Sequence, residues 1–142
     1  MALLSLGLVF SGFVSLFFLL PGKRPKKQPV QIAVLPEDEL PVRGVKRLEF
    51  SLPPSSGRRP VSRRVFLVKK DERLFALSAR CSHLGCLVEW SRFRQRFVCP
   101  CHGGMYDDEG RVTQGPPPGP LARIPVSIRE GRVYLELEGE PA

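Results

Sequence analysis

The sequence predicts an all-β protein of antiparallel sheets, with a small Cys/His-rich subdomain, preceded by one N-terminal transmembrane helix. Three observations support this prediction. After residue 21, apolar residues recur in short runs with the period of two typical of strands, and no stretch shows the period of a helix of ordinary length. The 142 residues include 15 Pro and 13 Gly, which is typical of a fold with many turns. All four Cys and both His lie between residues 81 and 102.

The N-terminal segment predicts a membrane anchor. Ala2 to Leu20 contains no charged residue, and a helix of this length approaches the roughly 30 Å thickness of the hydrocarbon core. A cleaved signal peptide is the alternative, but the apolar run is longer than a usual signal sequence and no basic residue precedes it. We therefore expect a retained transmembrane helix at residues 1–21.

A segment rich in proline and charge follows at residues 22–44. Its apolar residues are too scattered to form one face of a core. Proline restricts the backbone and favours extended, semi-rigid chain. The prolines near this segment are Pro21, Pro25, Pro29, Pro36 and Pro41. We interpret residues 22–44 as a tether and residues 45–142 as the folded domain.

The folded domain contains several runs with strand character, some of which pair as hairpins. Two pairs surround obvious turns, one at Lys70-Asp71-Glu72-Arg73 and one at Glu130-Gly131, where Gly tolerates the positive φ of a tight hairpin. A third pair joins the two Cys/His segments through Ser91 to Arg94. The predicted strands are Lys46–Ser51, Val65–Lys70, Leu74–Ala79, Leu87–Trp90, Gln95–Val98, Ile124–Arg129 and Arg132–Leu137.

The distribution of charge along the chain argues against a nucleic-acid partner, although the net charge alone does not. The formal net charge is +8, which is compatible with nucleic-acid binding in principle. The basic residues are nevertheless spread along the chain without interleaved aromatic residues. We therefore expect no nucleic-acid partner.

Two short segments hold all the residues suited to a soft metal. Box one is Cys81-Ser82-His83-Leu84-Gly85-Cys86, and box two is Cys99-Pro100-Cys101-His102-Gly103-Gly104. Each offers a thiolate and an imidazole from one loop, so that two loops together can hold a metal. Zinc is the alternative, but the Cys-x2-Cys knuckles usual in zinc ribbons and fingers are absent.

The two boxes together resemble those of the Rieske iron–sulfur proteins, in the form found in quinol–cytochrome c oxidoreductases of the cytochrome bc type. The resemblance covers residues 81–121 and implies a [2Fe-2S] cluster in loops at one tip of stacked antiparallel sheets. It implies four cluster ligands, Cys81, His83, Cys99 and His102. It also implies a disulfide between Cys86 and Cys101 that ties the two loops together. Two imidazoles in place of two thiolates raise the reduction potential above that of plant-type ferredoxins.

The same resemblance assigns residues that tune or cover the cluster. Tyr106 stands where the family's Tyr donates a hydrogen bond to a ligating sulfur. Gly104 stands where high-potential members commonly carry a Ser donor, so we expect a lower potential here and an increase in Gly104→Ser. The six residues Gly115, Pro116, Pro117, Pro118, Gly119 and Pro120 resemble the family's proline loop, which covers the cluster. Leu84 is expected to belong to the same apolar cap.

The implied function is electron transfer in a membrane complex. The family's subunit takes one electron, with a coupled proton, from quinol bound at a cytochrome b subunit, and His102 would contact that quinol. It then reduces a c-type cytochrome, within a complex that is commonly dimeric. The lower expected potential suits a quinol such as menaquinol. The alternatives are a Rieske ferredoxin or ring-oxygenase domain, which normally lacks the second pair of cysteines, and the Rieske subunit of a molybdenum enzyme such as arsenite oxidase.

The expected side of the membrane rests on two conflicting arguments. Four basic residues, Lys23, Arg24, Lys26 and Lys27, directly follow the apolar segment, and the positive-inside rule would therefore keep the domain in the cytoplasm. The resemblance implies a single-pass protein of the cell (inner) membrane with its domain on the periplasmic or equivalent outer side. We expect the outer side, because a disulfide suits an oxidising compartment.

Overall fold

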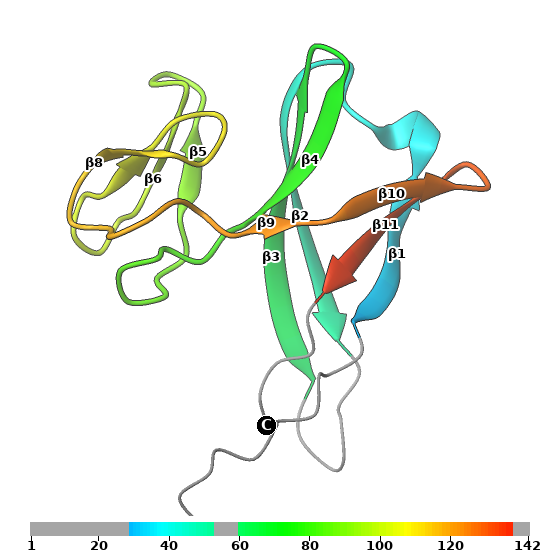
Figure 1. Ribbon diagram of the computed structural model, residues 1–142, viewed down its shortest axis with the longest axis horizontal. Coiled ribbons are helices and arrows are strands. Elements are labelled where there is room, and N and C mark those ends of the chain that lie inside the picture. Colours follow the sequence, from blue (N-terminus) through cyan, green and yellow to red (C-terminus); the bar gives the residue numbers. More distant parts are fainter. Residues whose placement is uncertain (1–28, 53–59, 138–142) are drawn as a thin grey trace, which may run out of the picture.

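A computed structural model of the chain describes residues 29–52 and 60–137 (Figure 1). The predicted anchor at residues 1–21 and the first part of the predicted tether lie outside these ranges. Within them, no helix is long and apolar enough to cross a membrane. The elements there are β1 (Val30–Pro36), the 3-10 helix η1 (Glu37–Glu39), β2 (Gly44–Leu52), β3 (Val61–Lys70), β4 (Arg73–Ser78), β5 (Glu89–Ser91), β6 (Arg96–Val98), β7 (Met105–Tyr106), β8 (Val112–Gln114), β9 (Arg123–Ile124), β10 (Val126–Arg129) and β11 (Arg132–Leu137).

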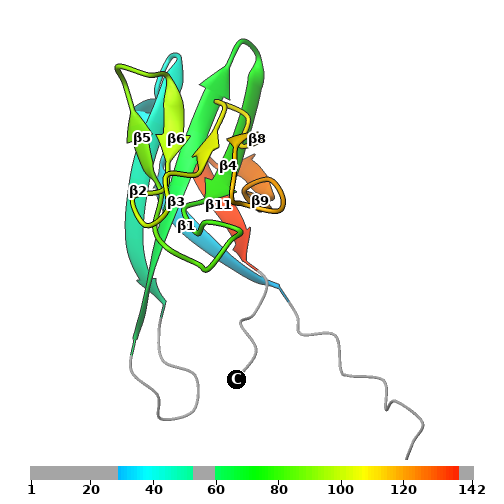
Figure 2. The same ribbon diagram turned by 90° about the vertical axis from the view of Figure 1, so that its left-hand side faces the viewer.

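The strands of the described ranges form three antiparallel sheets, which confirms the predicted all-β fold. The two larger units have the strand orders β1-β11-β10 and β2-β3-β4-β9, and a small sheet has the order β5-β6-β7-β8. The small sheet stands to one side of the other two in Figure 1, and Figure 2 views the molecule from that side. The small sheet is the predicted subdomain, because the two Cys/His boxes lie in the loops that enter and leave its strands.

Strand β3 is the central element of the fold. Its residues Val65–Val68 are each no more than 2% exposed, so this strand is apolar on both faces rather than on alternate residues. Val65 and Leu67 pack with Val133 and Leu135 of β11. Phe66 and Val68, which alternate with them, point to the opposite face and join the core beneath the small sheet. A strand covered on both faces is expected to read as a continuous apolar run.

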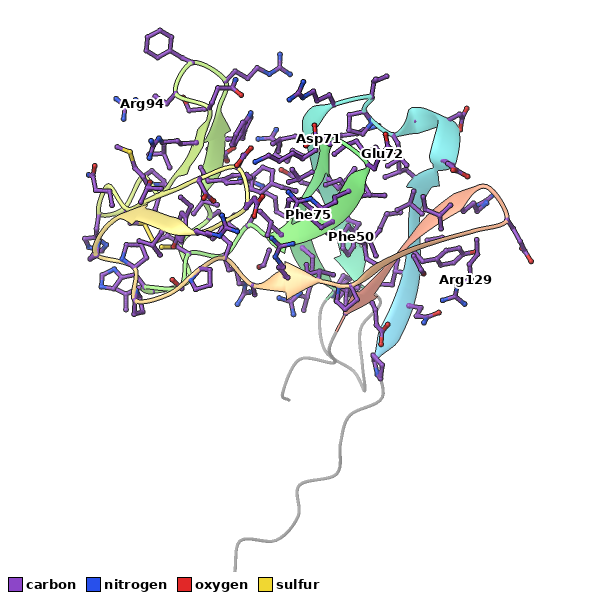
Figure 3. The ribbon with its side chains drawn as sticks, turned by 45° about the horizontal axis from the view of Figure 1, so that its top comes forward. Phe50, Asp71, Glu72, Phe75, Arg94 and Arg129 are labelled. Atoms are coloured by element: carbon purple, nitrogen blue, oxygen red, sulfur yellow. A yellow bond between two sulfur atoms is a disulfide. The ribbon has the colours of Figure 1, made fainter. Side chains whose placement is uncertain are left out.

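The two hairpins predicted from turn chemistry are confirmed. Strands β3 and β4 pair from Val65 opposite Ser78 to Lys70 opposite Arg73, and Asp71 and Glu72 lie at the turn (Figure 3). Strands β10 and β11 pair around Glu130 and Gly131, which have φ of 51° and 68°. Two successive positive φ values are the signature of the type I′ turn that matches strand twist.

The predicted pair between the boxes is present but shorter at one end than expected. Strand β5 pairs with β6 from Glu89 opposite Val98 to Ser91 opposite Arg96. Leu87, the expected first residue of this strand, instead forms an isolated antiparallel bridge with Arg80. The reason is that box one folds back on itself immediately before β5, so that its two ends meet.

The sheet begins earlier in the chain than the sequence predicts. Residues 30–44 were expected to belong to the tether, but Val30–Pro36 form β1 and pair along β11, with Val30 opposite Leu137. Leu35 is 7% exposed and belongs to the core between the two larger sheets. The prolines around β1 indicate a linker rather than a strand. The partner strand lies about a hundred residues away in sequence, so no local pattern indicates the pairing.

The small sheet shares its core with the second sheet. One apolar cluster contains Phe97 and Tyr106 from the small sheet together with Phe66 and Leu77 from β3 and β4. The rings of Phe66 and Phe97 lie with centroids 4.9 Å apart. Because the subdomain has no separate core, we expect it to unfold together with the sheets that support it.

Two groups of ion pairs also join the small sheet to its support. Glu89 of β5 binds Arg47 of β2, at 3.1 Å, and Arg64 of β3. On the other side, the carboxylate of Glu109 lies 2.9 Å from Arg73 and 2.7 Å from Arg111. The Glu109 side chain is only 7% exposed. The hydrogen bond from Arg73, together with the charges of neighbouring Arg111 and Lys70, outweighs burial and lowers the pKa of Glu109.

We expect Glu109→Gln to lower the melting temperature by several degrees at neutral pH. The folded-state pKa of Glu109 lies below its ordinary value of 4.5, so the carboxylate stabilises the fold above that pH and loses this effect as the pH falls through the folded-state pKa. Thermal melts from pH 7 to pH 3 should show the difference from the wild type shrinking in acid. The control is Glu72→Gln, an exposed residue of the β3–β4 turn. A difference independent of pH would contradict the assignment.

Candidate metal centre

Three loops meet beside the small sheet. Box one joins β4 to β5, box two joins β6 to β7, and the proline-rich segment 115–120 joins β8 to β9. Figure 1 shows these loops gathered at the end of the small sheet that lies opposite the β5–β6 turn. Each box follows or precedes a short strand whose buried residues anchor it in the shared core. The topology therefore brings together the two boxes that the sequence predicts to form one site.

The two boxes fold in the same way. In box one, the N–H of Gly85 donates to the carbonyl of Cys81 at 2.9 Å, and the N–H of Cys81 donates to the carbonyl of Cys86 at 2.8 Å. In box two, Gly103 donates to Cys99 at 3.0 Å, and Cys99 donates to the carbonyl five residues ahead at 2.8 Å. Gly85 and Gly103 have φ of 74° and 69°, a region that Gly adopts without steric cost.

The equivalent first cysteines of the boxes are buried and free. Cys81 is 3% exposed and Cys99 is 2% exposed, and neither belongs to a disulfide. The histidines lie farther out, with His83 partly buried and His102 exposed. Their ring centroids are 5.0 Å apart. The site therefore has two thiols on its inner side and two imidazoles on its outer side.

The remaining cysteines form the disulfide that the family resemblance implies. Cys86 and Cys101 are joined, with 15 residues of sequence separation, and link box one to box two. Cys99, Cys86 and Cys101 place their sulfur atoms within 4.8 Å of one another. Because two of these sulfurs are bonded to each other, this trio offers a metal only the thiol of Cys99.

The surroundings of Cys81 favour its thiolate form. Burial by itself raises the pKa of this thiol, but hydrogen bonds from the Tyr106 hydroxyl and from backbone N–H groups of the loop outweigh it, and the pKa of Cys81 is lowered. The Tyr106 oxygen lies 3.1 Å from the Cys81 sulfur. Burial and the contact with Cys81 raise the pKa of Tyr106, so the phenol remains protonated and donates. A metal binds the thiolate, so this environment is suited to a ligand.

Ser82 connects Tyr106 to the proline loop, a role that the sequence did not predict. The Ser82 N–H donates to the Tyr106 oxygen at 3.2 Å, and the Ser82 hydroxyl donates to the carbonyl of Gly119. A serine beside a cysteine carries no sequence signal for either contact, because both partners are more than twenty residues away. The contacts place the proline loop directly over box one.

The proline loop also contacts box two. Pro117 is the buried proline of this segment, and its ring lies against Gly104. Gln114, the last residue before the loop, donates from its side chain to the carbonyl of Gly103 at 3.3 Å. Leu84 is 71% exposed and is not buried beneath the loop. Its place in an apolar cap stays a prediction.

Comparison with known proteins identifies the family of this fold. The sequence profile of the Rieske [2Fe-2S] domain matches residues 30–125 of the chain. The chain belongs to the Rieske family. The Rieske domain therefore begins at β1, in agreement with the sheet that β1 completes, and its cofactor is a [2Fe-2S] cluster.

Relatives of this Rieske protein include iron-sulfur subunits of cytochrome b6-f complexes. The cytochrome b6-f complex iron-sulfur subunit of Chlorobaculum tepidum is 31% identical over 120 residues, which cover 84% of this chain and 61% of that protein. The chloroplastic subunit of Pisum sativum is 45% identical over 73 residues, covering 49% of this chain and 32% of that protein. The chain thus spans less than two thirds of the length of these relatives.

Solved structures show the same Rieske fold. The cyanobacterial plasma membrane Rieske protein from Synechocystis PCC 6803 superposes with a TM-score of 0.52 at 24% identity, over 75% of this chain and 97% of that one. The oxygenase–ferredoxin complex of carbazole 1,9a-dioxygenase gives 0.51 at 21% identity, over 82% of this chain and 30% of that one. At these identities the likeness extends to the fold alone.

The residues of the site are chemically suited to the cluster of a Rieske protein. Such a cluster takes two thiolates on one iron and two imidazoles on the other. Two buried thiols and two outer imidazoles are available from the two boxes, and the hydroxyl of Tyr106 stabilises negative charge on one of the sulfurs. The donor types therefore match, with two sulfur and two nitrogen atoms.

Tyr106→Phe is expected to lower the reduction potential of the Rieske protein. The Tyr106 hydroxyl donates to the Cys81 sulfur, and a donor stabilises the more negative, reduced form. A hydrogen bond to a charged group contributes roughly 1.5 kcal/mol, which for one electron corresponds to about 60 mV. Redox titration followed by EPR measures the shift. The other tyrosine, Tyr134 in β11, supplies the control, since Tyr134→Phe leaves the site intact; an equal shift in both variants would contradict the assignment.

Proposed function

We propose that this Rieske protein is the electron-transfer subunit of a membrane quinol oxidoreductase of the cytochrome bc type. The observation that carries the proposal is the Cys86–Cys101 disulfide between the two cluster loops. Rieske ferredoxins and ring oxygenases normally lack this pair of cysteines, so the disulfide favours the quinol-oxidising class. The similarity to cytochrome b6-f complex iron-sulfur subunits supports the same class.

The proposed ligands are Cys81 and Cys99 on the inner iron and His83 and His102 on the outer iron. The cluster, when bound, accepts one electron at a time. His102 is exposed, so its ring can meet a partner molecule from outside the chain. Its proposed role is to contact quinol and to take up a proton at the ring nitrogen that does not bind iron. The buried cysteines and the proline loop keep water from the inner side of the site.

The proposed partners follow from this function. Quinol is presented by a cytochrome b subunit, and the electron passes to a c-type cytochrome, within a complex that is expected to be dimeric. Gly104 offers no side-chain donor, so the proposed potential is low and suited to a quinol such as menaquinol. The proposed location is the cell (inner) membrane, with one transmembrane helix and the domain on the outer side. Protease added to intact spheroplasts should cleave the domain, and protection would contradict this topology.

The decisive experiment is EPR spectroscopy of reduced membranes with and without a quinol-site inhibitor. The expected result is a Rieske-type signal whose shape changes when the inhibitor is added, because the inhibitor contacts the exposed histidine side of the site. Purification of the complex should also recover cytochrome b. An EPR signal that the inhibitor does not change, together with a molybdenum subunit in place of cytochrome b, would assign the chain to the molybdenum oxidoreductases instead.

A further inference from the structure

Gly104 is glycine because there is no room for a side chain. A Cβ atom placed on it would lie 2.5 Å from Cγ and 2.7 Å from Cδ of Pro117, whereas carbon atoms pack at about 3.5–4.0 Å. Its neighbour Gly103 presents the opposite case, since it has a φ of 69° and open space around the Cβ position. Gly103 is thus required by backbone conformation and Gly104 by the closeness of Pro117.

The contact between Gly104 and Pro117 is held from both sides. The carbonyl of Gly104 accepts the N–H of Cys99 at 2.8 Å, which fixes box two beneath it. The proline loop is held before Pro117 by the Gln114 side chain and after it by the Ser82 hydroxyl, which bonds the carbonyl of Gly119. Neither loop can withdraw without breaking one of these hydrogen bonds.

We infer that Pro117 fills, with apolar carbon, the space that a side chain at position 104 would occupy, and that the two residues lower the reduction potential as a pair. The inference rests on the proposed cluster ligands and extends them to a positioning residue. A serine hydroxyl or a water at this place would stabilise the reduced, more negative form, whereas a proline ring carries no donor. Gly104 removes the donor, and Pro117 prevents water from replacing it.

This inference changes the result expected from Gly104→Ser alone. The added side chain has to displace the Pro117 ring, which is rigid, and the loop hydrogen bonds resist that displacement. The single substitution is therefore expected to disturb the proline loop and to raise the potential only slightly. The full rise requires room for the hydroxyl, which Pro117→Ala provides by removing two ring carbons.

The test is a double-mutant cycle on the full chain with its cluster, using redox titration and EPR. The four proteins are the wild type, Gly104→Ser, Pro117→Ala and the double variant. We expect the reduction potential of the double variant to rise by more than the sum of the shifts in the two single variants. The expected coupling is equivalent to about a tenfold change in the reduction equilibrium, or about 59 mV. Additive shifts, or a full rise in Gly104→Ser alone, would overturn the inference. Pro118→Ala, the same change at an exposed ring of the loop, should shift the potential less than Pro117→Ala.

A second measurement keeps the test decisive if Gly104→Ser loses its cluster. Gly104→Ala adds only the methyl group, so it should lower the melting temperature in the wild-type background and do so much less in the Pro117→Ala background. Equal losses in both backgrounds would overturn the inference. Neither potential nor melting temperature involves quinol, so failure here is distinct from failure of the proposed function, which the inhibitor experiment tests.

Discussion

Cys81→Ser is expected to abolish the cluster, an effect as large as any that we expect from a single substitution in the chain. Iron and acid-labile sulfide should both fall to background in the purified variant, and the Rieske EPR signal should disappear. The physical reason is that iron–sulfur chemistry requires the soft thiolate. The Cys81 thiol is buried, and its pKa is already lowered by the hydrogen bond from Tyr106 and by backbone N–H groups. A serine hydroxyl stays protonated there, and its oxygen is a harder and weaker ligand for iron than the thiolate sulfur.

A matched comparison is available within the same two loops. Each box has an inner cysteine that is free and an outer cysteine that is in the disulfide. Serine at Cys81 or Cys99 should remove the cluster entirely, whereas serine at both Cys86 and Cys101 should leave part of it. If the inner variants retain iron and the outer variants do not, the ligand assignment is reversed. Finding zinc without acid-labile sulfide in the wild type would instead contradict the assignment of a [2Fe-2S] cluster.

The strands that could be predicted from sequence are those whose signals are local. The hairpins at Asp71-Glu72 and Glu130-Gly131 combine alternating residues with short turns, and the structure contains both. Strand β1 was missed because its signal is not local. Val30–Pro36 lies among prolines, and it forms a strand because it pairs with the edge of β11. This pairing is distant in sequence, so no local pattern predicts it.

The features of the candidate site also fall into those that a local sequence pattern predicts and those that it does not. The metal-binding chemistry was predictable because it depends on residue type and spacing, and the two boxes carry both. The contacts that connect the loops were not predictable, since they depend on how the loops approach one another in space. Three contacts, Ser82 with Gly119, Pro117 with Gly104 and Arg73 with Glu109, each join segments separated by more than ten residues. The sequence shows Gly104 as a missing donor, and only the structure shows what occupies its place.

Replacing the disulfide by Cys86→Ser/Cys101→Ser is expected to have the largest effect on stability. The disulfide closes a loop with a sequence separation of 15 residues, and the chain-entropy estimate for such a loop is about 3 kcal/mol. For a domain of this size, the melting temperature should fall by roughly 10 °C or more. The cluster should also be lost faster, because the two boxes are then held together mainly by the proline loop and by the cluster itself.

Reductant provides the control for this variant. A thiol reductant should lower the melting temperature of the wild type toward that of the double-serine variant and should leave the variant unchanged. Both cysteines are replaced together, since a single substitution would leave one free thiol beside Cys99. Wild-type stability and cluster retention in the double variant would show that the loops are held by other contacts. The hydrogen bonds from Ser82 and Gln114 to neighbouring loops would then be the principal connection between the boxes.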